Sequence, residues 1–228
     1  TDMLDQAKEE QVQWWKDIKE SQLKSIYASV CRDGRNSHLP KMEEMMATTK
    51  SRPIDYDPVE SFHQFPNQND ASYAEQKLAV QTNITSIDKY CGRHGRNGAL
   101  TCTRNSIIHG SPGSGKSYVV QTSVFYSISQ GLNTLSSCIQ GARANAIGGI
   151  HLHKWILLHD QKHTRFSYRA AQQAVEKILR KPINLHAVLT LDVLFLDECG
   201  QISAEQVATL DIIFRKVRRS NLPFGGVL

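Results

Sequence analysis

The chain has 228 residues, of which 40% are hydrophobic and 21% are charged, with 14 glycines and 7 prolines. This composition is typical of a folded globular protein and excludes collagen-like, mucin-like and wholly disordered chains. The net charge is +5, but residues 1–60 hold 9 Lys and Arg against 12 Asp and Glu, whereas residues 61–228 hold 18 against 10. The basic part is compatible with a polyanionic partner such as nucleic acid, and equally with ordinary solvated side chains.

The sequence carries no signal for a membrane or for a secreted disulfide framework. No stretch approaches the roughly 18 consecutive apolar residues that a membrane span needs, and residues 1–10 are polar and acidic, unlike a secretory signal. The five cysteines are widely spaced and include no C-x-x-C pair, which argues against disulfide and zinc-ribbon folds. We expect an intracellular protein without a membrane partner. Because the chain begins with Thr, we also expect an excerpt or a processed product.

The N-terminal third is predicted to be an appendage to the main domain. Residues 1–30 have the pattern of one charged, loosely amphipathic helix that contains Trp14 and Trp15. Residues 32–70 are rich in turn and breaker signals and show little periodicity, which is typical of a linker. We therefore predict an N-terminal helix and irregular linker over 1–70 and a compact domain over 71–228.

Strand and helix patterns alternate through the second part of the chain. A helix is expected from residue 71, followed by a Gly- and Arg-rich loop over 91–98. Short apolar runs predict buried strands at 106–109, 134–139 and 191–196. Helices are predicted at 116–130, which Gly131 closes, at 169–181, which Pro182 stops, and at 203–218, which begins with a Ser-x-x-Gln capping box. This alternation predicts an α/β fold with a parallel sheet flanked by helices.

The strongest motif is a phosphate-binding loop that matches G-x-x-x-x-G-K-[ST] at every fixed position. Its residues are Gly110, Ser111, Pro112, Gly113, Ser114, Gly115, Lys116 and Ser117. Main-chain N–H groups of such a loop, together with the positive end of the following helix, hold the phosphates of a nucleotide. Lys116 is expected to reach the β- and γ-phosphates of ATP, and Ser117 to bind Mg²⁺. An incidental Gly-rich turn is disfavoured because the motif follows an apolar run and opens a helix.

A second element, about 80 residues downstream, is an apolar run that ends in two carboxylates, Asp197 and Glu198. A carboxylate at the end of a strand can hold the Mg²⁺ of a bound nucleotide, and its neighbour can activate the attacking water. We expect Asp197 to bind the metal and Glu198 to act as the base. With Lys116, these two residues form the predicted catalytic set.

Three stretches resemble the PIF-one (petite integration frequency) DNA helicases. Residues 140–153 are similar to that family's motif Ia, T-G-x-A-A-x-N-I-G-G-x-T-I-H, and residues 197–205 to its motif II, D-E-I-S-M-V-S. Residues 222–228 resemble its K-P-F-G-G-x-Q segment. In order and spacing the resemblance covers residues 72–228.

The resemblance implies a RecA-like ATPase domain of a superfamily 1B helicase that unwinds DNA 5′ to 3′, in repair, recombination or telomere maintenance. Gln76 lies in a stretch similar to the Q motif and would contact adenine. Gly141, Arg143 and His153 lie in motif Ia and its extension and would be near single-stranded DNA. A eukaryotic protein of this kind would act in the nucleus or mitochondrion.

The sequence also departs from the family pattern. Gln140 replaces the usual Thr of motif Ia, and Cys199 and Gly200 replace Ile-Ser in motif II. Motif III and a second motor domain are not among these 228 residues, so we expect a partial first motor domain that alone binds ATP weakly and hydrolyses almost none.

Two other functions stay open at this point. One is a different P-loop ATPase, such as an AAA+ loader or a transposon-encoded ATPase. The other is a non-catalytic fragment that binds nucleic acid. The basic cluster Arg215, Lys216, Arg218 and Arg219 either faces DNA or complements a helix C-terminus. Neither the histidines at 151, 153, 159 and 163 nor the set Cys91, His94 and Cys102 matches a complete zinc pattern.

Overall fold

The computed structural model describes residues 2–31, 39–59, 73–95, 105–158 and 167–228. The chain divides into two compact units: unit 1 comprises Thr1–Ser25 and Asn133–Val227, and unit 2 comprises Ile26–Leu132 together with Leu228. The boundary expected at residue 70 stays a prediction. Helix α1 (Asp2–Cys31) confirms the predicted N-terminal helix and supplies residues to both units.

Unit 1 contains a parallel sheet. In the described residues it has three strands in the order β2–β1–β3, namely β1 (Thr134–Cys138), β2 (Ile150–His151) and β3 (Val193–Asp197). Along β1 and β3, Thr134 lies opposite Val193 and Cys138 opposite Asp197. Because the strands are parallel, their carboxyl ends share one edge of the sheet. This sheet and the helices around it confirm the predicted α/β class.

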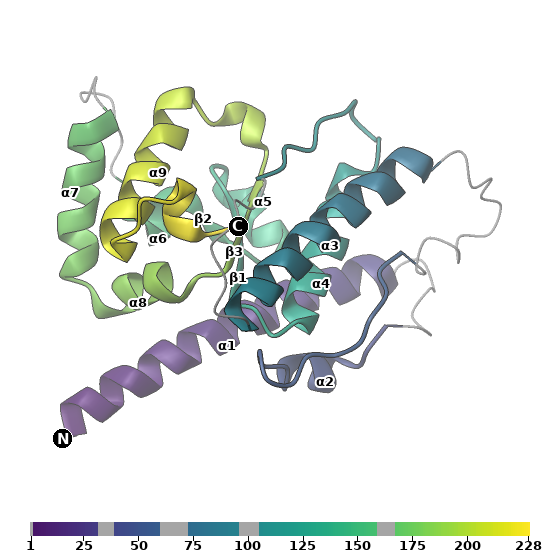
Figure 1. The fold of residues 1–228 in the computed structure, drawn as a ribbon, viewed down its shortest axis with the longest axis horizontal. Helices are drawn as coiled ribbons and strands as arrows, with labels where there is room; N and C mark the ends of the chain where they lie inside the picture. The colour runs from purple at the N-terminus through teal and green to yellow at the C-terminus, as the bar shows by residue number, and fades with distance from the viewer. Residues whose placement is uncertain (1, 32–38, 60–72, 96–104, 159–166) are drawn as a thin grey trace. The chain divides into compact units, whose positions relative to one another are not determined.

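Helices surround the sheet of unit 1, and α7, α8 and α9 lie beside one another (Figure 1). The helical elements of this unit are α5 (Gly141–Ala146), α6 (Leu152–Trp155), α7 (Ser167–Leu179), α8 (Pro182–Thr190), η3 (Cys199–Gln201), α9 (Ala204–Arg218) and η4 (Pro223–Gly226). The Ser203 hydroxyl accepts a hydrogen bond from the N–H of Gln206, as the predicted capping box requires. Pro182 not only follows α7 but also opens α8, where a missing N–H has no consequence.

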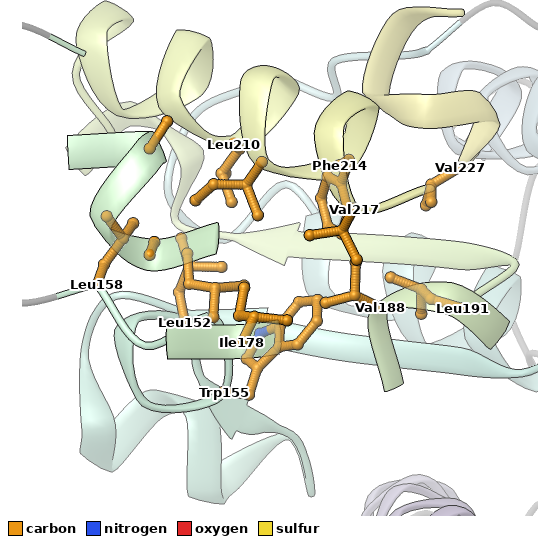
Figure 2. Close-up of a cluster of buried hydrophobic side chains, with 14 of the residues drawn as sticks. Leu152, Trp155, Leu158, Ile178, Val188, Leu191, Leu210, Phe214, Val217 and Val227 are labelled. Carbon is orange, nitrogen blue, oxygen red and sulfur yellow. The ribbon is translucent and has the colours of Figure 1, made fainter. Parts of the chain in front are cut away.

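The apolar core of unit 1 contains buried side chains of α6, α7 and α9. Figure 2 shows Leu210 and Phe214 of α9 above Leu152, Trp155 and Ile178. All five side chains are at most 3% exposed, and burial of each contributes about 1.5–3 kcal/mol to folding. This core supports β3, the strand that ends at Asp197 and is followed by Glu198.

The N-terminal helix packs on the same core. Ile18 is buried in it, and Trp14 and Trp15 pack against it while partly exposed. The Trp15 indole N–H donates to the Thr190 hydroxyl at 2.9 Å. Both tryptophans therefore contribute to the packing of α1 on the core of unit 1. Burial also lowers the pKa of Lys19, on the same helix, to about 8.

A buried glutamine of α1 hydrogen-bonds the main chain of β1. The Gln22 side chain is fully buried; its amide N–H donates to the Thr134 carbonyl at 2.9 Å and its carbonyl accepts from the Ser136 N–H at 2.7 Å. The short strand β2 pairs only with Ser137 and Cys138. The Gln22 amide thus makes the contacts that a neighbouring strand would make to the first part of β1.

Unit 2 is helical in the described residues. It contains α2 (Met42–Met46), α3 (Ala74–Gly95) and α4 (Lys116–Ser129), with α3 and α4 packed together around Val80 and Val119. The Tyr126 hydroxyl on α4 donates to Asp88 on α3 at 2.6 Å. Burial and this hydrogen bond raise the pKa of Tyr126. Gly131 closes α4 with a φ of +71°, as predicted.

Two predictions in unit 2 are wrong. Residues 91–95 continue α3, so the expected loop over 91–98 does not begin at Cys91; residues 96–98 lie outside the described chain. Residues 106–109 form no strand: Ile107 is 83% exposed, and of the two isoleucines only Ile108 packs against the Val80 cluster. An isolated four-residue apolar run forms a strand only where a partner strand takes its N–H and C=O groups, and unit 2 offers none in the residues described.

The linker role expected for residues 32–70 stays a prediction. Residues 39–59 are irregular apart from α2 and an isolated bridge between Thr49 and Arg52; residues 32–38 and 60–70 lie outside the described chain. No helix in the described residues is long and apolar enough to cross a membrane.

Candidate functional site

The phosphate loop, residues 110–117, belongs to unit 2 and leads directly into α4. Gly113 and Gly115 have φ values of +79° and +80°, in the left-handed region that glycine adopts without strain. The Ser114 N–H donates to the Ser111 carbonyl at 3.2 Å and closes the turn between them. At Gly110, a Cβ atom would come within 2.8 Å of the Ser114 hydroxyl oxygen, so the loop also has little room there.

Lys116 folds back over this loop. Its ammonium group donates to the carbonyls of Gly110 and Ser111 at 2.7 and 2.8 Å. Among the described residues, no side chain caps the N-terminus of α4, whose N-cap is Gly115. A positive ammonium group and an uncapped helix N-terminus next to each other favour an anion. Ser117 is exposed in the first turn of the same helix, and Pro112 is exposed at the turn of the loop.

Gln76 of α3 contacts the loop. Its side-chain amide donates to the Ser114 carbonyl at 3.1 Å, and a Cβ at Gly115 would lie 3.8 Å from the Gln76 Cγ. Gln76 therefore helps to hold the loop in shape. Its expected contact with adenine stays a prediction.

The acidic pair belongs to unit 1 and lies at the carboxyl end of β3. Asp197 is the last residue of the strand, and Glu198 follows it with φ +54° and ψ +41°. This left-handed conformation is unfavourable for a residue with a side chain, and such strain gathers at functional sites. Asp197 Oδ1 accepts from the Glu198 N–H at 3.1 Å, while the Glu198 side chain is exposed.

Arg143 of α5 forms an ion pair with Asp197. Its Nε donates to Asp197 Oδ2 at 2.6 Å, in an ion pair whose side chains are 34% and 17% exposed. The structure thus joins two residues for which the sequence predicts separate roles, DNA contact for Arg143 and metal binding for Asp197. A clue exists in the sequence, because both residues closely follow predicted strands, but the strand order is needed to pair them.

The other predicted DNA-contacting residues lie nearby in the chain. Gly141 is the first residue of α5, and a Cβ there would be 3.8 Å from the His151 ring. His153 of α6 is half-buried; its ring packs edge-on against His151 with centroids 5.5 Å apart, and its Nε2 lies 3.5 Å from the Gln206 amide nitrogen. Their contact with DNA stays a prediction.

The basic cluster of α9 is mainly structural. The Arg218 guanidinium donates to the carbonyls of Val188, Leu189, Leu191 and Gly225 at 2.8–3.0 Å. Arg215 pairs with Asp211 at 2.8 Å, and the Lys216 ammonium lies 4.3 Å from the centre of the Tyr168 ring. These contacts favour the structural alternative over a DNA-facing patch for Arg215, Lys216 and Arg218.

The zinc alternatives receive no support from the described residues, in which no three His, Cys, Asp or Glu side chains gather as a metal site. Cys102, His159 and His163 lie outside the described chain, and so does the His94 side chain.

Comparison with known proteins finds relatives with one common description. An ATP-dependent DNA helicase Pif1 from Psychrobacter sp. is 25% identical over 130 residues, which are 56% of this chain and 18% of the relative. The ATP-dependent DNA helicase RRM3 of Saccharomyces cerevisiae is 31% identical over 126 residues, 54% of this chain and 16% of the relative. The Saccharomyces cerevisiae helicase PIF1 is 28% identical over 127 residues, 54% of this chain and 14% of the relative.

No protein-family model matches the chain. Among solved structures, the Pif1 helicase from Candida albicans is similar with a TM-score of 0.45 and 25% identity, over 51% of this chain and 26% of that one. The chain thus spans less than a fifth of the length of the curated relatives that it matches.

Proposed function

We propose that this chain belongs to the Pif1 family of ATP-dependent DNA helicases, as its similarity to the relatives described above supports, and that it acts as the first motor domain of such a helicase. The observation that carries the proposal is the phosphate loop, where Lys116 lies over two loop carbonyls at the uncapped start of α4. The relatives favour a helicase over the other P-loop ATPases that the loop alone would allow.

In this proposal ATP binds at residues 110–117. The glycines at positive φ let the loop curve around a phosphate, and the Lys116 ammonium exchanges its carbonyl acceptors for phosphate oxygens. Gln76, already bonded to the loop, is proposed for the adenine. Hydrolysis of the bound ATP supplies the free energy for movement along DNA.

The proposed ligands of Mg²⁺ are Asp197 and the Ser117 hydroxyl, on the sequence pattern of the two motifs. A carboxylate and a hydroxyl are the hard oxygen donors that Mg²⁺ prefers. The Asp197 carboxylate already holds a positive group, the Arg143 guanidinium, which agrees with a site for a cation. Glu198, with its exposed carboxylate next in the chain, is proposed to accept the proton of the attacking water.

The proposed partner is single-stranded DNA, contacted through Gly141, Arg143 and His153. Unwinding in the 5′ to 3′ direction and roles in repair, recombination and telomere maintenance are proposed from the family. So is an intracellular location, with the nucleus or mitochondrion for a eukaryotic source.

The test of the phosphate loop is nucleotide binding. We expect the chain to bind a fluorescent ATP analogue in the presence of Mg²⁺. Lys116→Ala should weaken that binding by at least about tenfold, because charge-assisted hydrogen bonds to phosphate are lost. The measurement is a fluorescence titration, with thermal melting to show that both proteins are folded.

Lys89→Ala is the matched control, because it removes an exposed lysine of α3 in the same unit and leaves the loop unchanged. It should bind like the unmodified chain. Equal binding by the Lys116→Ala variant, or none by the unmodified chain, would contradict the proposed function.

A further inference from the structure

The ion pair between Arg143 and Asp197 joins the two functional segments of unit 1. The guanidinium Nε lies 2.6 Å from Asp197 Oδ2, a short distance even for a charge-assisted hydrogen bond. Arg143 belongs to the segment proposed for DNA, and Asp197 is the residue proposed for Mg²⁺. One contact therefore connects the two ligands that the proposed function requires.

The fold holds both partners in place. Cys138 ends β1 opposite Asp197, the end of β3, so the turn after β1 brings α5 to the edge where the carboxylate projects. The segment that follows α5 packs closely on main chain, since a Cβ at Gly148 would lie 2.2 Å from the Ser21 carbonyl and one at Gly149 2.1 Å from that of Ser136. Tight packing at its C-terminal side fixes the helix, and thus the origin of the Arg143 side chain.

The guanidinium and a metal ion cannot use this carboxylate oxygen together. Mg²⁺ requires oxygen ligands at about 2.0–2.1 Å in octahedral geometry. A guanidinium on the same oxygen would place two positive charges within a few ångströms of each other and would block part of the coordination sphere. Asp197 Oδ2 can therefore serve Arg143 or the metal at one time.

The Arg143 guanidinium can separate from the Asp197 carboxylate. The Arg143 side chain is about one third exposed, so the separated guanidinium can be solvated, which lowers the cost of breaking the ion pair. A guanidinium is also suited to bidentate contact with phosphate. Release from Asp197 thus turns Arg143 from a partner of the carboxylate into a donor for the DNA backbone.

We propose that Arg143 is a tethered cation that competes with the divalent metal for Asp197, and that its release to a DNA phosphate favours metal binding. Arg143 is then a positioning residue that couples the two ligands. The inference rests on the proposed function for the identity of both ligands. Linkage requires the coupling to be reciprocal: DNA tightens the metal, and the metal tightens DNA by the same factor.

The test measures binding of Mn²⁺ to the full chain by electron paramagnetic resonance, without nucleotide, so that no phosphate oxygen contributes to the metal site. Asp197→Asn defines the share of binding that depends on Asp197. At that site, Arg143→Ala and Arg143→Gln should each bind Mn²⁺ about three- to fivefold more tightly than the unmodified chain, because the competing ion pair is absent. An oligo-dT should tighten Mn²⁺ binding of the unmodified chain by a similar factor and leave both variants unchanged.

Lys154→Ala is the matched control, since it removes an exposed positive charge from α6 in the same unit, without a contact to Asp197. It should behave like the unmodified chain and thus separates competition at the carboxylate from a general change in charge. Unchanged or weaker Mn²⁺ binding by both Arg143 variants, with melting temperatures that show folded protein, would overturn the proposal. So would an oligo-dT effect that persists in them. Failure of nucleotide binding in the Lys116 experiment would instead count against the proposed function.

Discussion

The acidic pair of unit 1, Asp197 and Glu198, and the phosphate loop of unit 2 are each held in place in a different way. In unit 1, Asp197 ends a strand that is paired along its whole length with β1, so its position depends on contacts between distant parts of the chain. In unit 2, the phosphate loop is shaped by its own glycines, by Lys116 and by Gln76. The difference teaches that changes near β1 should act mainly on stability, whereas changes in the loop should act mainly on binding.

The largest effect should come from a glycine of unit 1. Gly148 has φ +64°, and a Cβ there would lie 2.2 Å from the Ser21 carbonyl oxygen. Gly148→Ala should therefore lower the free energy of unfolding by about 3 kcal/mol or more. Gly113→Ala in the loop, where a Cβ meets nothing within 4 Å of the described structure, should lower it by only about 1–2 kcal/mol, from its φ of +79°. Urea denaturation measures both.

Gly200→Ala is the control, because a Cβ has open space there and the residue has no positive φ. It should unfold at the same urea concentration as the unmodified chain. Equal losses for Gly148→Ala and Gly113→Ala would break the distinction between the two units.

The next effect compares two buried amides. Gln22 of unit 1 bonds the main chain of β1, whereas Asn83 of unit 2 donates to the Ser123 hydroxyl at 2.9 Å and accepts from the Ser106 hydroxyl at 2.9 Å. Gln22→Ala removes two hydrogen bonds to buried main-chain groups of β1 and should lower the free energy of unfolding by about 3 kcal/mol. Asn83→Ala should lower it by about 1–2 kcal/mol, because hydroxyl groups can turn to other acceptors.

Thermal and urea unfolding of the two variants give this comparison directly, with Gln172→Ala, at an exposed position of α7, as the control for a lost amide. A larger loss for Asn83→Ala than for Gln22→Ala would contradict the role of Gln22 as a substitute for a strand.

The smallest effect concerns acid. Burial lowers the pKa of His186, on α8, below its ordinary value of 6.5. Below pH 6.5 the unfolded chain therefore binds a proton that the folded chain resists, and stability falls as the pH falls. His186→Gln should remove part of this fall. Melting temperatures between pH 7.5 and 5 measure the difference, and identical slopes for the variant and the unmodified chain would contradict it.

Local signals predicted local structure well. The capping box at Ser203, the glycine after α4 and the carboxylates at the end of β3 were all visible, because each depends on residues close in the chain. The apolar run at 106–109 predicts a strand that does not form, since apolar character alone does not supply a partner strand. The sequence pattern does not predict α8, because a proline that stops one helix can also be the first residue of the next, as Pro182 is.

The contacts that the sequence did not predict are those that join distant elements. The pairing of Arg143 with Asp197 depends on β1 and β3 being neighbours, and the Gln22 bridge depends on α1 lying along β1. Neither follows from periodicity. The roles of Lys116, Ser117 and Glu198 stay predictions, because each concerns a ligand. The same holds for the residues expected to contact DNA.

The Gln22 bridge has a consequence for the order of folding. Gln22 and Thr134 are separated by 112 positions, so the glutamine leaves the ribosome long before its strand exists. Gln22 can form these hydrogen bonds only after Thr134 and Ser136 have been synthesised. Closure of so long a loop is entropically costly and slow, and completion of unit 1 is therefore expected to be a late event in the maturation of the chain.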